Sequence, residues 1–151
     1  MRWLRDEHGA RSVGMMGMSL GGYVTALMAS LDPELAFAVT IVAPTSFADI
    51  MWHHGEGRNE RLASIARGLT LEDLRALMAV HSPMMRPARI PPERLLMIWG
   101  EGDRIVPGVH HLALWEHWGQ PEARRFPGGH FLQYGRSGYL HHARRWITHT
   151  A

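Results

Sequence analysis

The stretch VGMMGMSLGGY, residues 13–23, constrains the fold of this chain more than any other. An apolar run leads to a serine flanked by glycines, and a helix-compatible run, GGYVTALMAS, follows at once. Residues 17–21 fit the pattern G-x-S-x-G, in which a serine occupies a strained turn between a strand and a helix. Gly17 and Gly21 are expected to let the strand and the helix pass closely and to leave the Ser19 hydroxyl exposed. The helix N-terminus favours negative charge, so the Leu20 N–H is the predicted oxyanion donor.

Four apolar or β-branched runs alternate with helical patterns along the chain, which is typical of a parallel sheet flanked by helices. The first three runs lack polar alternation and are expected to be buried on both faces. The capping-box pattern of Thr70 and Asp73 supports one helix start, and residues 2–8 suffice for the last turns of another helix. The sequence therefore predicts an α/β fold in a single domain, residues 1–151. The expected strands are 12–18, 38–43, 95–99 and 123–126, and the expected helices are 22–30, 60–67, 71–79, 109–118 and 139–149.

The segment 44–94, between the second and third expected strands, is much longer than a strand-to-strand crossover needs. It is rich in methionine and ends in the proline-rich stretch 87–92, which cannot be helical. Methionine adapts to varied ligand shapes, so this insertion is interpreted as a helical, lid-like element over a pocket. Ordinary core packing of the same apolar residues is an equally weighted alternative.

Composition excludes several kinds of chemistry. All sixteen basic residues are arginine, against fourteen acidic residues, and the chain has no cysteine. These absences exclude lysine nucleophiles, a P-loop lysine, disulfides and thiolate sites. The arginine pairs at 124–125 and 144–145 lack interleaved aromatics and are expected to be solvated surface rather than a nucleic-acid site. No apolar run approaches a bilayer span and no leader is evident, so a cytoplasmic protein is expected.

An aspartate and a histidine follow the third and fourth expected strands. Asp103 lies in GEGDRIVP and His130 in PGGHF, both in glycine-rich loops. Because the carboxyl ends of parallel strands meet at one edge of a sheet, Ser19 is expected to lie beside them. A serine nucleophile needs a base, and the base needs an orienting acid. Asp49, after the second strand, is a backup acid, whereas Glu101 is expected to be a solvent-facing turn residue.

Adjacent histidines raise the possibility of a metal site. Neighbouring residues on a helix or strand point in different directions, and no carboxylate recurs at ligand spacing. These histidines are therefore expected at the surface, and neither a metal nor an organic cofactor is predicted. The pairs are residues 53–54, 110–111 and 141–142.

The motifs GMSLGG, GEGDRIVP and GGHF, in this order, resemble those of the α/β-hydrolases. The resemblance implies a serine hydrolase that cleaves carboxylic esters with short or medium acyl chains, through an acyl-enzyme. The resemblance also implies a catalytic triad of Ser19 as nucleophile, His130 as base and Asp103 as acid. A thioesterase or a peptidase would use the same triad and stays open, whereas a haloalkane dehalogenase would need an aspartate in place of Ser19. Candidate substrate-pocket residues are Met18, Trp52 and Phe131.

The resemblance covers nearly the whole chain but only the second half of the family's domain. The family's loop that gives a second oxyanion N–H lies outside the matched part, which leaves one backbone donor. The strand at 12–18 is then an edge strand, and an apolar edge is a template for association. We expect a homodimer through this edge, in which the partner chain could supply the missing donor. A catalytically weak or silent fragment that acts as an interaction module is the alternative.

Overall fold

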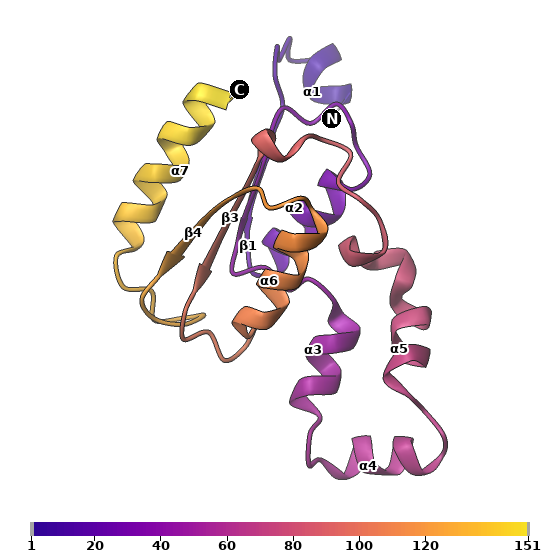
Figure 1. Ribbon diagram of the computed structural model, residues 1–151. Helices are drawn as coiled ribbons and strands as arrows, with labels where there is room; N and C mark the ends of the chain where they lie inside the picture. Colours follow the sequence, from indigo (N-terminus) through magenta and orange to yellow (C-terminus); the bar gives the residue numbers. More distant parts are fainter. Residues whose placement is uncertain (1, 151) are drawn as a thin grey trace.

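A four-stranded sheet forms the centre of the computed structural model, which describes residues 2–150. The strands lie in the order β1-β2-β3-β4, and all three pairings are parallel. Helices cover the sheet on two sides (Figure 1). The predicted α/β class is therefore confirmed, and each strand lies within about two residues of its expected position except at the start of the first. The strands are β1 (Met15–Met18), β2 (Ala38–Ile41), β3 (Leu95–Gly100) and β4 (Glu122–Phe126).

Seven α-helices lie within residues 2–150, and five of them match the expected helical patterns. The residues before β1 form a short helix, also as expected, whereas the helix at Phe47–His54 was not predicted. The helices are α1 (Arg2–Asp6), α2 (Leu20–Ala29), α3 (Phe47–His54), α4 (Asn59–Ala66), α5 (Leu71–Met78), α6 (Gly108–His117) and α7 (Arg136–Thr150). None of the helices in this described range is long and apolar enough to cross a membrane.

Two hydrophobic clusters, one on each face of the sheet, hold these layers together. Alternate residues of β3 point to opposite faces, as strand geometry requires. Leu95 and Met97 pack with α2 and α6, whereas Leu96 and Ile98 pack with α7. Every residue of β2 and β3 is buried, as expected for strands covered on both faces.

The first strand differs from its prediction in length and burial. Only Met15–Met18 is paired as strand, and no residue of β1 is fully buried. Met16 keeps 45% of its surface exposed. The physical reason is that β1, within residues 2–150, has a neighbouring strand on one side only. The expectation of burial on both faces was therefore wrong for this strand, while its predicted position at the sheet edge is correct.

The insertion at 44–94 is helical and carries α3, α4 and α5. Figure 1 shows these helices extending from the end of the sheet at which the strand arrows point, on the side of α2 and α6. Helix α3 begins where the Ser46 hydroxyl accepts a hydrogen bond from the Asp49 N–H, which is an ordinary N-cap. The capping box predicted from Thr70 and Asp73 is present at the start of α5. The proline-rich stretch has no α-helix, and only a 3-10 turn begins at Pro92.

Candidate active site

Ser19 is the single residue between the end of β1 and the start of α2. Its backbone has φ 52° and ψ −119°, an uncommon conformation for a residue other than glycine. The Ser19 N–H donates to the Ile41 carbonyl at 2.8 Å, which ties the turn to β2. The hydroxyl makes no capping bond to the helix. The turn thus presents the hydroxyl outward instead of using it within α2.

Glycines make this turn possible. A Cβ at Gly17 would lie 2.2 Å from the Gly21 carbonyl oxygen, so β1 and α2 could not approach as they do. Gly21 takes part through its backbone only, because a Cβ there would meet nothing within 4 Å. The second position that requires a bare backbone is Gly22, where a Cβ would lie 2.8 Å from the Ala43 Cβ. The expectation that both flanking glycines are sterically required therefore holds for Gly17 and fails for Gly21.

Asp103 follows β3 by three residues, and only 5% of its surface is exposed. Its Oδ1 accepts hydrogen bonds from the N–H groups of Ile105 and Val106, both at 2.9 Å. These two donors hold the carboxylate against its own loop, and Oδ2 remains available to the His130 ring. The carboxylate is buried yet hydrogen-bonded at both oxygens, as a buried charge requires.

His130 joins the aspartate to the serine. Its Nδ1 donates to Asp103 Oδ2 at 2.9 Å, and its Nε2 accepts from the Ser19 hydroxyl at 2.8 Å. With Nδ1 protonated, Nε2 carries the lone pair that faces the hydroxyl. The structure thus brings together all three residues that the sequence placed at one sheet edge, although they lie 84 and 27 residues apart along the chain.

Two further residues hold the histidine in place, and sequence reasoning missed both. The Gln133 side-chain amide donates to the His130 carbonyl at 2.8 Å. The Tyr139 hydroxyl in turn donates to Gln133 Oε1. Tyr139 is buried against Phe126 on the α7 side of the sheet, and burial raises the pKa of its hydroxyl. No motif marks these residues, because their role depends on the path of the loop after β4.

The loops that carry the acid and the base touch each other through their backbones. The Gly102 N–H donates to the Gly128 carbonyl at 2.8 Å. Gly128 has φ +112°, and a Cβ there would lie 2.2 Å from the Leu132 carbonyl oxygen. Only glycine fits this position, so the glycine-rich loops seen in the sequence have a specific steric cause.

The rival acids lie elsewhere. Asp49 pairs with Arg75 on α5, with 2.5 Å between Asp49 Oδ1 and Arg75 Nη2. Burial opposes ionisation of Asp49, but hydrogen bonds from Arg75 and Ser46 outweigh it, so its pKa is below the usual value. Glu101 is exposed at the turn after β3, as expected. Neither carboxylate contacts His130.

The remaining candidate residues are dispersed. Leu20 opens α2, so its N–H has no partner within the helix, and its side chain is 62% exposed. Phe131 is 84% exposed, with its ring edge-on to that of His130 at 5.3 Å between centroids. The Met18 sulfur accepts a hydrogen bond from the Gln133 side-chain amide at 3.9 Å. Trp52 lies in the insertion beneath the Arg61 guanidinium, so of the three pocket candidates only Phe131 and Met18 lie near Ser19 and His130.

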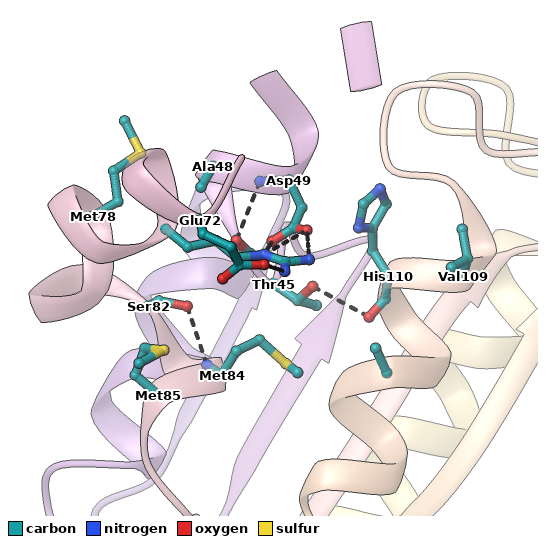
Figure 2. Close-up of a pocket in the computed structure, with 13 residues that line it drawn as sticks. Thr45, Ala48, Asp49, Glu72, Met78, Ser82, Met84, Met85, Val109 and His110 are labelled. Carbon is teal, nitrogen blue, oxygen red and sulfur yellow. Dashed lines mark hydrogen bonds and ion pairs between the residues drawn. The ribbon is translucent and has the colours of Figure 1, made fainter. Parts of the chain in front are cut away.

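A cavity of about 460 Å³ lies between the insertion and α6. Figure 2 shows Asp49 and Glu72 on one side of it and His110 on the other, with Met78, Met84 and Met85 around the apolar part. Burial lowers the pKa of His110 below its usual value, more than the nearby Asp49 raises it. The methionines of the insertion therefore do line a pocket, but none of Ser19, Asp103 and His130 is among its lining residues.

The paired histidines do not all lie at the surface. His111 is only 2% exposed and stacks on Trp99, with 5.5 Å between ring centroids. Burial lowers its pKa to about 4. The expectation of surface residence was therefore wrong for His111, because α6 turns this position toward β3. Across residues 2–150, no three histidine or carboxylate side chains gather closely enough to hold a metal ion.

No protein-family model matches the chain. Two uncharacterized proteins from two strains of Mycobacterium tuberculosis are 31% identical over 131 residues, which cover 86% of this chain but 31% of each relative. The chain thus spans less than a third of the length of these curated relatives.

Solved structures with a similar fold include hydrolases. An esterase from Pyrococcus furiosus matches 99% of the chain with TM-score 0.67 and 16% identity, over 59% of its own length. Acetyl xylan esterase from Paenibacillus sp. R4 matches 89% with TM-score 0.65 and 20% identity, over 44% of its length. Puromycin hydrolase matches 85% with TM-score 0.60 and 18% identity, over 20% of its length. The fold is therefore that of the α/β-hydrolases, and this chain matches only part of the length of each neighbour.

We predict that Gly17→Ala destabilises the protein by about 2–3 kcal/mol, because its Cβ would clash with backbone that cannot move freely. Gly21→Ala is the matched control and should change stability by less than about 1 kcal/mol, since alanine fits there and favours the helix. Urea unfolding followed by circular dichroism measures both. Equal losses in the two variants would contradict the steric account of the turn.

We predict that burial of neutral His111 makes stability depend on pH. The unfolded state binds this proton near pH 6.5 and the folded state only near pH 4. The contribution of neutral His111 to the free energy of unfolding is therefore complete above pH 6.5 and is lost as pH falls toward 4. The loss between pH 7 and pH 5 is about 2 kcal/mol. In His111→Phe, which keeps a ring against Trp99, the measured loss over this range should be smaller by that amount. An unchanged loss would show that His111 is not the titrating group.

Proposed function

We propose that this protein is a serine hydrolase that cleaves carboxylic esters of short or medium acyl chain through an acyl-enzyme. The observation that supports it is the continuous hydrogen-bonded line from Asp103 through His130 to Ser19. The hydroxyl of Ser19 has no competing bond to its helix, and the fold neighbours include two esterases.

In the first half of the reaction, the Ser19 oxygen attacks the ester carbonyl while its proton passes to His130 Nε2. Asp103 holds the ring by its Nδ1–H and stabilises the imidazolium that forms. The negative charge on the substrate oxygen develops near the start of α2, where the Leu20 N–H is the proposed donor. His130 then returns the proton to the leaving alcohol.

In the second half, water replaces the alcohol. His130 takes a proton from the water, which attacks the acyl carbon, and the Ser19 hydroxyl is restored when the acid leaves. A site with one backbone oxyanion donor instead of two would have a kcat lower by a factor of about 10²–10³. The same groups would serve a thioesterase or a peptidase, and parallel turnover of ester, thioester and amide substrates separates these activities.

The test is hydrolysis of p-nitrophenyl butyrate by the wild type, Ser19→Ala and Asp103→Asn. Ser19→Ala should lower kcat by at least about 10³-fold, because it removes the nucleophile. Glu101→Gln is the matched control, since this exposed carboxylate lies two residues from Asp103, and it should keep full activity. Equal rates in the wild type and Ser19→Ala would overturn the hydrolase proposal and favour a catalytically silent interaction module.

We also propose that two copies of the chain associate through the edge of β1. Exposed apolar side chains of Met16, Leu20 and Val24 lie on this strand and on the helix that follows it. Unpaired backbone groups at such an edge favour pairing with another strand. A partner copy would cover these side chains and could bring a further N–H toward Ser19.

We predict that Met16→Lys, which puts a charge on this edge, shifts the protein from dimer to monomer in sedimentation at micromolar concentration. Leu77→Lys, an exposed position in the insertion, is the control and should leave the sedimentation unchanged. A wild type that sediments as a clean monomer would refute the association.

A further inference from the structure

The end of the chain is strongly basic. Residues 123–151 contain five arginines and four histidines and no aspartate or glutamate, whereas the whole chain has a net charge of only +2. Two arginine pairs account for most of this charge, at 124–125 and at 144–145. Eighteen residues, 126–143, separate the pairs along the sequence, so their relation depends on the fold.

The fold brings one member of the second pair beside the first pair. Helix α7 lies alongside β4 (Figure 1). Between them is a cavity of about 320 Å³, whose lining includes Arg124 and Arg125 from the strand and His141, His142 and Arg145 from the helix. Its volume is at the lower end of the range for small-molecule sites.

No carboxylate belongs to the cavity lining. Within residues 2–150, no ion pair joins Arg124, Arg125 or Arg145 to an acidic side chain. The nearest acid, Glu122, contacts His142 Nε2 at 2.8 Å, and Arg124 donates to Nδ1 of the same ring at 3.3 Å. Arg124 and Arg145 thus line one cavity, and neither forms an ion pair with an acidic side chain, which favours the binding of an anion there.

We propose that this cavity binds the phosphate group of a small phosphate monoester. The planar guanidinium groups of Arg124 and Arg145 can each donate two hydrogen bonds to one phosphate, a geometry that lysine cannot provide. Arg125 is not one of the binding groups, because its guanidinium lies 5.7 Å from the centre of the Trp99 ring, on the face of the sheet opposite to α7. Tyr134, which is 64% exposed and also lines the cavity, offers a ring face to the organic part of the ligand.

The site adjoins the proposed catalytic base without overlapping it. Tyr139 lines the cavity and hydrogen-bonds to Gln133, which holds the His130 carbonyl. The binding groups themselves lie on β4 and α7, so the ligand would not compete with an ester at Ser19. The proposal therefore does not rest on the hydrolase activity.

The test is isothermal titration of the whole chain with phenyl phosphate, with inorganic phosphate in parallel. Arg124→Gln and Arg145→Gln should each weaken phenyl phosphate binding about tenfold, the effect of one lost charge-assisted contact. Arg144→Gln is the matched control, because it removes the same charge from the adjacent residue outside the cavity, and it should keep wild-type affinity. Ser19→Ala should bind as the wild type does, which separates this site from the catalytic proposal.

Three outcomes would overturn the proposal. Equal weakening by Arg144→Gln would show that diffuse surface charge attracts the phosphate. Binding to phosphatidylserine vesicles without binding to phenyl phosphate would make the region a lipid-binding surface. Binding to a single-stranded oligonucleotide, again without phenyl phosphate, would make it a nucleic-acid surface.

Discussion

The parallel pairing of β2 with β3 is the interaction on which the rest of the structure depends. Both strands are buried along their whole length, and their side chains hold α2 and α6 on one face and α7 on the other. The ladders that join β2 to β1 and β3 to β4 also continue past the strand ends. The Ser19 N–H bonds to Ile41, and the Glu101 N–H bonds to Phe126. The turns that carry the proposed catalytic groups therefore begin inside the ladder, which limits how far these groups can move.

This arrangement explains how a small chain can orient three distant side chains. Asp103 is fixed by two N–H groups of its own loop, and His130 by Gln133 through its carbonyl. The two loops meet backbone to backbone at Gly102 and Gly128. Asp103 and His130 are therefore held by their own loops as well as by the hydrogen bonds that join the three side chains. Such support is what keeps reacting groups within the narrow geometry that catalysis needs.

The insertion and the basic cavity lie at different places on this framework. The insertion extends from the carboxyl end of β2 and lines a cavity with α6, whereas the basic cavity lies between β4 and α7. Tyr139 links the basic cavity to the loop of His130 through Gln133. Helix α7 thus supports the His130 loop through Tyr139 and contributes Arg145 to the basic cavity.

Local sequence patterns determined the class of the fold, the order of its elements and the turn at Ser19. Apolar runs, glycines and capping residues act over a few positions, so a single sequence reveals them. The convergence of Ser19, Asp103 and His130 followed from the same patterns, because parallel strands place their carboxyl ends at one edge.

Tertiary structure decided what depends on contacts between distant segments. It set the exposure of β1, the burial of His111 against Trp99 and the support of His130 by Gln133. It also brought Arg145 beside Arg124, which the sequence separates by twenty-one positions. Local patterns specify which face of a helix is apolar, but the partner of that face is chosen by the packing of the whole chain.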